Sequence, residues 1–155
     1  MSQLHFGGGT PTFLSDDELE RLMADLRAAF VFEPDAEISI EVDPRTATPQ
    51  RLAQLRKLGF NRLSFGVQDF DARVQVAVHR VQSFEDVRDL MQSARTLGYA
   101  SVNVDLIYGL PLQTTESFAR TIAQVTTLRP DRIALYAYAH PVSYTHLTLP
   151  TILLV

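Results

Sequence analysis

The sequence predicts an α/β fold, a partial open β/α barrel of five parallel strands. Short strand-like runs alternate with longer segments of helical spacing along the 155 residues, and strands joined by helices form parallel sheets with right-handed crossovers. This alternation fits an open doubly wound sheet as well as a barrel. However, the strands have one apolar and one polar face, whereas strands covered by helices on both faces read as continuous apolar runs. A polar face suits a barrel lumen that holds a polar ligand.

The N-terminal half is expected to form two strands, each followed by a helix. The first helix begins after Ser15, a good N-cap, and Glu18 completes the spacing of a capping box. Pro44 follows the end of the second strand, Pro49 opens the second helix, and Gly59 ends it. The two strands are expected at Leu4–Phe6 and Ala36–Val42.

The C-terminal half continues the pattern with three strands and two helices. The third strand is followed by a long polar connection, residues 68–83, and Gly98 ends the helix that comes next. A loop with a glycine and a proline, residues 108–111, follows the fourth strand. The strands are expected at Arg62–Val67, Ser101–Ile107 and Arg132–Tyr138, and the helices at Phe84–Leu97 and Thr115–Thr127.

Polar residues end three of the expected strands. Side chains alternate between the two faces of a strand, and this alternation places Glu41, Gln68 and Asp105 on the polar face at equivalent strand ends. Active sites of β/α barrels lie at the C-terminal ends of the strands. Carboxylates there suit ribose hydroxyls or an ammonium group through charge-assisted hydrogen bonds. A lone acid at such a position is as often simply solvated, so the prediction rests on the three together.

The loop Gly7–Pro11 is the strongest local signal for ligand binding. Glycine permits positive φ and a close approach of the backbone to a ligand. The loop lacks the lysine of a phosphate-binding P-loop and is not a G-x-G-x-x-G fingerprint. It is interpreted as a ligand-cradling backbone, with a structural turn as the alternative. Arg80 fits a surface position, or a guanidinium that clamps a carboxylate. The four histidines show no ligand spacing and are taken as structural or exposed.

Composition excludes several classes of function. The net charge is −4 and no basic face is evident, so nothing supports nucleic-acid binding. No apolar run is long enough to span a membrane, and the N-terminus is not a signal peptide, so a cytoplasmic setting is expected. The chain has no cysteine, which rules out disulfides, thiolate metal sites and a cysteine nucleophile within these residues.

Five motifs together resemble one enzyme family. The chain is similar to the oxygen-independent coproporphyrinogen III oxidases (dehydrogenases), radical S-adenosylmethionine (SAM) enzymes of haem biosynthesis. The resemblance covers roughly residues 2–140, so we expect a partial radical SAM core domain over 1–140. Residues 141–155 match nothing in the family and are expected to be an artefactual or disordered tail. The motifs occur in order as Gly7–Thr12, Glu41–Arg45, Asn61–Phe70, Asp105–Pro111 and Tyr138–His140.

The resemblance implies a six-stranded open TIM-like barrel of the radical SAM type, of which this chain supplies about strands two to six. In the family a four-iron–four-sulfur cluster, held by a CxxxCxxC loop, reduces SAM with an electron from a donor. The resulting 5′-deoxyadenosyl radical abstracts hydrogen from the propionate side chains of coproporphyrinogen III, and two propionates become vinyl groups, giving protoporphyrinogen IX. By position, residues that contact the methionyl part of SAM are Gly8, Gly9 and Thr10. The binding surfaces for two SAM molecules are completed by Glu41, Gln68, Arg80, Asp105 and Ala139.

The chain departs from the family pattern in what it lacks. The cluster cysteines, the first strand and the family's C-terminal domain find no match here, so we expect this fragment to bind SAM but not to catalyse. The alternative is a cluster-free SAM- or haem-binding module, similar to the family's haem-chaperone relatives. An unrelated β/α-barrel aldolase would need a lysine or a metal at a strand end, and the only lysine, Lys57, lies in an expected helix.

Overall fold

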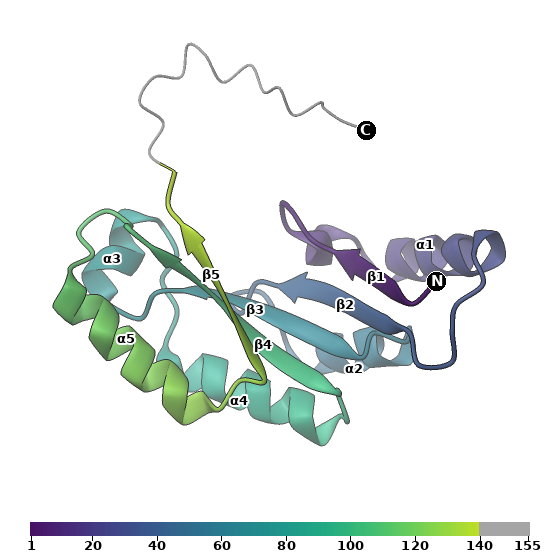
Figure 1. Cartoon of the computed structure of the whole chain (residues 1–155). Helices are drawn as coiled ribbons and strands as arrows, with labels where there is room; N and C mark the ends of the chain where they lie inside the picture. Colours follow the sequence, from purple (N-terminus) through teal and green to yellow (C-terminus); the bar gives the residue numbers. More distant parts are fainter. Residues whose placement is uncertain (140–155) are drawn as a thin grey trace, which may run out of the picture.

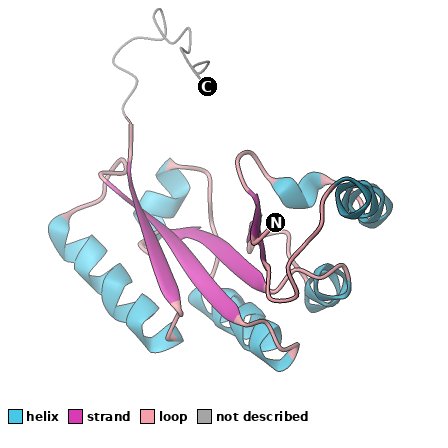
Figure 2. Ribbon diagram, turned by 45° about the vertical axis from the view of Figure 1, so that its right-hand side comes forward, coloured by secondary structure: helices cyan, strands magenta, loops and turns pink. Residues whose placement is uncertain are grey.

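A computed structural model describes residues 1–139. Five parallel strands form one sheet in the order β1-β2-β3-β4-β5. The sheet is curved, and α2, α4 and α5 lie along its outer side (Figure 1). Figure 2 shows the same arrangement from a second direction, with the inner side of the strands free of helices. The predicted partial barrel is therefore confirmed. The tail predicted over 141–155 lies outside the described residues.

The elements follow the predicted order with two additions, a short helix and a 3₁₀ turn. The strands are β1 (Gln3–Phe6), β2 (Glu37–Val42), β3 (Arg62–Gln68), β4 (Ser101–Tyr108) and β5 (Arg132–Ala137). The helices are α1 (Asp16–Ala29), α2 (Pro49–Lys57), α3 (Ala72–Ala77), α4 (Phe84–Thr96) and α5 (Thr115–Leu128), with a 3₁₀ turn, η1, at Pro11–Phe13.

Local signals determine where the helices begin. The capping box at α1 is formed as predicted, with Ser15 accepting from the Glu18 amide and Glu18 accepting from the Ser15 amide. Helix α3 was not predicted, because its six residues lie inside the segment interpreted as a polar connection. Its start is fixed by Asp71, whose carboxylate accepts from the amides of Arg73 and Val74. An aspartate N-cap of this kind was available in the sequence.

The core lies between the outer face of the sheet and the helices. Side chains of β2, β3 and β4 alternate as predicted, and their apolar members are buried, among them Ile40, Phe65 and Val104 at 0% exposure. They pack with Leu52 and Met91 from α2 and α4. Burial of an apolar side chain of this size stabilises the fold by about 1.5–3 kcal/mol. The other buried apolar side chains fill the space between the sheet and the helices.

Strand β5 departs from this pattern. The alternation predicts an apolar face on each strand that helices can cover, but Ile133 and Leu135 on β5 are 50% and 53% exposed. Within residues 1–139 this face of β5 is therefore half open, and the expectation is wrong there. None of the helices in this part of the chain is both long and apolar enough to cross a membrane.

Candidate functional site

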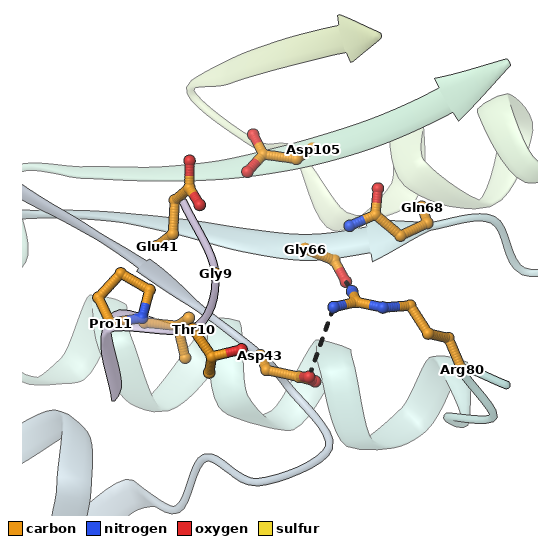
Figure 3. A pocket seen from close by; sticks show the side chains of 10 residues that line it. Gly9, Thr10, Pro11, Glu41, Asp43, Gly66, Gln68, Arg80 and Asp105 are labelled. Carbon is orange, nitrogen blue, oxygen red and sulfur yellow. Dashed lines mark hydrogen bonds and ion pairs between the residues drawn. The ribbon is translucent and has the colours of Figure 1, made fainter. Parts of the chain in front are cut away.

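The C-terminal ends of β2, β3 and β4 and the glycine loop after β1 surround an open cavity of about 120 Å³. Figure 3 shows that side chains from all four segments face this space. Because successive strands are parallel, their ends meet at one edge of the sheet, so residues far apart in the sequence are brought together. The lining residues are Gly9, Thr10, Pro11, Glu41, Val42, Asp43, Gly66, Gln68, Arg80 and Asp105.

The glycine loop is tied to the end of β2. The backbone N–H of Gly8 donates to Glu41 Oε2 over 3.2 Å. Gly8 and Gly9 have φ values of +74° and +53°, and a Cβ on either would meet no atom within 4 Å. These glycines are thus required by backbone conformation rather than by crowding within the chain, and they leave the space beside the loop open for a ligand.

Gln68 stands at the end of β3 in an unusual conformation. Its φ is +66°, and the register with β4 shifts between Gly66 and Gln68. Its side-chain Oε1 is buried and has no hydrogen-bond partner among the described residues. Figure 3 shows the amide turned toward the cavity. A buried acceptor without a partner costs free energy, so the Gln68 amide is a candidate contact for a polar group of a ligand.

Arg80 is held at the cavity by two neighbouring strands. Its Nη1 donates to the Gly66 carbonyl over 3.3 Å, and its Nη2 lies 3.7 Å from Asp43 Oδ2. Asp43 is buried and also accepts from Arg45, whose Nη2 is 2.5 Å from Oδ2. Hydrogen bonds from Arg45 lower the pKa of Asp43, and the nearby Arg80 charge adds to this effect. The carboxylate is therefore ionised and shared between two guanidinium groups.

Asp105 occupies the corresponding place on β4. Its Oδ1 accepts from the Ser64 hydroxyl over 2.6 Å, and the residue is 8% exposed. Burial raises the pKa of Asp105, the bond from Ser64 opposes this effect, and the Glu41 carboxylate adds to it. Two carboxylates that face one cavity repel each other, and a cationic group between them would relieve this repulsion. The site thus favours a ligand that carries positive charge.

Below this cavity, the inner face of the sheet carries a polar cluster. His5 lies 2.8 Å from Ser39 Oγ through Nδ1, and its Nε2 is 3.6 Å from Glu41 Oε1. Deeper in the lumen, Glu37 pairs with both Arg62 and Arg132. The histidines were interpreted as structural or exposed, and His5 is half-exposed, but it also contacts a residue of the candidate site. This contact links the polar cluster on the inner face of the sheet to the candidate site at the strand ends.

Most of the predicted site residues come together. Gly9, Thr10, Glu41, Gln68, Arg80 and Asp105 line the cavity, and Gly8 joins it through Glu41. Ala139 does not: it is exposed, lies two residues beyond β5, and lines neither this cavity nor the lumen. Its assignment as a ligand contact stays a prediction.

Sequence reasoning missed Asp43 and Arg45. Both lie in the Glu41–Arg45 motif, but neither was predicted as a site residue. An acid followed two residues later by an arginine was the available signal. The partner Arg80 is 37 positions away from Asp43, and nothing in the local pattern indicates that contact.

The donor set of the chain suits SAM and does not suit an iron–sulfur cluster. The cavity offers carboxylates, a glycine loop and the Gln68 side chain, which fit the ammonium, sulfonium and hydroxyl groups of SAM. Iron–sulfur clusters are held by cysteine thiolates, and the 155 residues contain none. Among residues 1–139, no group of three His, Cys, Asp or Glu side chains is arranged to hold a metal ion.

Comparison with known proteins agrees with this geometry. Curated relatives named oxygen-independent coproporphyrinogen III oxidase come from Pseudomonas aeruginosa, 54% identical over 142 residues, and Salmonella typhimurium, 56% identical over 140. Each alignment covers 90% of this chain and 31% of the relative, so the chain spans about a third of the length of these proteins.

Solved structures give the same result. The coproporphyrinogen III oxidase of Escherichia coli, described as a radical SAM enzyme, superposes with a TM-score of 0.85 at 55% identity, covering 90% of this chain and 32% of that one. The archaeal Elp3 of Methanocaldococcus infernus, 19% identical with a TM-score of 0.71, covers 88% of this chain and 36% of that one, and shares the fold alone. The family model for the radical SAM superfamily matches residues 2–125. The chain therefore belongs to the radical SAM superfamily.

Proposed function

We propose that this chain forms the SAM-binding part of an oxygen-independent coproporphyrinogen III oxidase. The observation that carries the proposal is the cavity at the strand ends, where Glu41, Gln68 and Asp105 face the glycine loop. The names of relatives that are 54% and 56% identical support the reaction. In the proposed reaction, two propionates of coproporphyrinogen III are oxidatively decarboxylated to vinyl groups.

The cavity offers a separate contact for each polar end of SAM. Charge-assisted hydrogen bonds are about twice as strong as neutral ones, so Glu41 and Asp105 are the residues we assign to its ammonium group and ribose hydroxyls. Arg80 is the cation at the cavity, and we assign it to the carboxylate. The positive-φ loop at Gly8 and Gly9 lets the backbone approach the ligand closely.

Redox chemistry is not assigned to these residues. They contain no cysteine, so the cluster that would reduce SAM finds no thiolates here, and we assign the chain SAM binding without SAM cleavage. The tetrapyrrole substrate, an electron donor and a cytoplasmic setting belong to the proposal for the whole enzyme. The net charge of −4, with no basic face, gives no support for a nucleic-acid partner.

The second candidate is a cluster-free module that binds SAM or haem. Such a module needs no thiolate, and the residues that line the cavity include none. The two candidates differ in ligand preference, because a haem module would bind haem more tightly than SAM. Competition between haem and SAM for the purified chain separates them.

Calorimetric titration of SAM into the purified chain tests the proposal. We expect saturable binding that Glu41→Ala weakens by about tenfold, because a charge-assisted hydrogen bond contributes roughly 1.5–3 kcal/mol. The matched control is Glu20→Ala, which removes an exposed carboxylate from α1 and should leave binding unchanged. After anaerobic reduction we expect no 5′-deoxyadenosine. Absence of binding at millimolar SAM, or equal binding by wild type and Glu41→Ala, would refute the proposal.

A further inference from the structure

Gln68 is held in a strained turn at the edge of the cavity. The Asp69 amide donates to the Val67 carbonyl over 2.8 Å, so three residues form a γ-turn with Gln68 at its centre. With φ at +66° this is the rare and strained form of that turn. Strained residues persist only where the surrounding structure over-determines them, and they concentrate at ligand sites.

The next residue supplies that surrounding structure. Asp69 is 1% exposed, and its carboxylate accepts three hydrogen bonds. Oδ1 accepts from the Asp71 amide at 2.7 Å and from the Thr121 hydroxyl at 2.5 Å, and Oδ2 accepts from Gln113 Nε2 at 2.5 Å. The donors come from the loop after β3, from α5 and from the loop after β4. One buried side chain thus connects three elements around the cavity.

The donor and the acceptor in each hydrogen bond around the Asp69 carboxylate can be assigned from their other partners. Gln113 Oε1 accepts from the Gly109 amide at 2.6 Å, while its Nε2 donates both to Asp69 and to the Ile107 carbonyl. Rotating the Gln113 amide would therefore set its NH₂ group against the N–H of Gly109. The Thr121 hydroxyl accepts from the Phe70 amide at 3.1 Å and so has its proton free for Asp69. The three donors around Asp69 are all satisfied only if both of its carboxylate oxygens act as acceptors.

The backbone on the other side of Gln68 is also bonded. Gln82 Nε2 donates to the Val67 carbonyl at 2.7 Å, and Gln75 Nε2 donates to the Asp69 carbonyl at 3.0 Å. The strained residue therefore lies between two fixed peptide groups. Its side-chain Oε1 is buried without a hydrogen-bond partner, and the residue lines the cavity.

We propose that Asp69 is a positioning residue, which acts through Gln68. Its carboxylate holds the γ-turn and the loop after β4 in one arrangement, and this arrangement presents the Gln68 amide to the ligand before the ligand arrives. Asp69 itself lines no cavity among those at the strand ends. The identity of the ligand, SAM, rests on the proposed function. The hydrogen bonds that Asp69 makes do not depend on it.

A double-mutant cycle on SAM affinity tests the link. Asp69→Asn places an NH₂ group against Gln113 Nε2, and we expect it to weaken SAM binding about tenfold, as expected for the loss of roughly one hydrogen bond. Gln68→Ala should cause a similar loss, and the double variant should be no weaker than Gln68→Ala alone. Additive losses would mean that Asp69 acts elsewhere, and unchanged binding by Asp69→Asn would overturn the proposal. Asp89→Asn, on the exposed side of α4, is the matched control and should not change affinity.

Two further measurements keep the test decisive. Amide hydrogen exchange at Gly109, followed by NMR without SAM, should accelerate at least tenfold in Asp69→Asn, because the acceptor on Gln113 is displaced. If Asp69→Asn does not fold, Thr121→Val is the alternative, and it should give the same non-additivity with Gln68→Ala. It keeps the side-chain shape but removes one of the three bonds to Asp69, together with the acceptor of the Phe70 amide.

The two claims fail in different ways. If the wild-type chain does not bind SAM, the proposed function is wrong, while exchange at Gly109 still decides whether Asp69 holds the loops. If SAM binds but exchange at Gly109 is the same in wild type and Asp69→Asn, the positioning role is wrong and the proposed function stands.

Discussion

The backbone N–H of Gly8 lies 3.2 Å from Glu41 Oε2, which joins the loop after β1 to the end of β2. Gly7, one residue earlier, packs against the same carboxylate: a Cβ at this position would lie 2.6 Å from His5 Nε2 and 2.8 Å from Glu41 Oε1. The conformation of the loop therefore depends on where the Glu41 side chain lies. Substitutions at Gly7 and Gly8 distinguish side-chain crowding from backbone conformation as the reason for glycine in this loop.

Gly7→Ala should affect binding more than stability. The atoms that a Cβ would meet are the ends of two flexible side chains, so they will rotate away at small cost and the Gly8 bond to Glu41 will be lost. We expect SAM affinity to fall about tenfold while the free energy of unfolding changes by less than about 0.5 kcal/mol. Calorimetry and urea unfolding measure the two effects. A large loss of stability with unchanged affinity would contradict this account.

Gly8→Ala should affect stability through the backbone. At φ +74° a Cβ meets no neighbour, so the cost is that of the left-handed region for a residue with a side chain, about 1 kcal/mol. Gly98→Ala is the matched control, because Gly98 has φ +77° and equally open space but lies after α4. Both variants should lose similar stability in urea, and only Gly8→Ala should weaken SAM binding. Equal affinities would show that the loop does not touch the ligand.

Arg45→Met should destabilise the protein, relative to the wild type, more at neutral pH than in acid. Arg45 lowers the pKa of Asp43 from its ordinary value of 3.8, so the pair contributes stability above that value and loses it as the pH falls through the lowered pKa. We expect a loss of about 1–2 kcal/mol at pH 7, which shrinks as the pH falls below 3.8 and through the lowered pKa of Asp43. Urea unfolding across this range provides the measurement. A difference that stays constant with pH would show that Arg45 acts through its bond to the His79 carbonyl instead.

Asp105→Asn should stabilise the fold and weaken binding. Burial raises the pKa of Asp105, so its contribution to stability is fully present below the ordinary pKa and is lost as the pH rises through the raised pKa. The variant keeps an acceptor for Ser64 and carries no charge. Its unfolding free energy at pH 7 should exceed that of the wild type, on the order of 1 kcal/mol per unit of pKa shift, and the gap should close on acidification. A variant that is less stable at pH 7, or that binds SAM normally, would contradict the role given to this carboxylate.

Strand alternation predicted much of the fold and the site, because burial imposes a period of two on each strand. Ile40 is fully buried while its neighbour Glu41 faces the cavity. The same reasoning failed for β5, where Ile133 is half exposed. A strand pattern shows which side is apolar, but it does not show whether a helix covers that side.

The contacts that fix the site were not visible in the sequence. The γ-turn at Gln68 has no turn residue such as glycine or asparagine at its centre, and it is held by partners far away in the chain. Asp69 reaches Gln113 and Thr121 across 44 and 52 positions. Such pairs depend on how loops meet once the sheet has formed. The motifs identified the ends of the strands, and the structure shows which side chains hold them there.

Mapping of SAM on the chain by NMR tests the central claim most directly, since a protein of 17.4 kDa gives a resolved amide spectrum. On titration with SAM we expect the largest shifts at the amides of Gly8, Gly9 and Gln68, with the α1 amides unchanged. Shifts that concentrate instead on the surface between α3 and α5, around Ala72 and Gln124, or no shifts at saturating SAM, would contradict a ligand site at the strand ends.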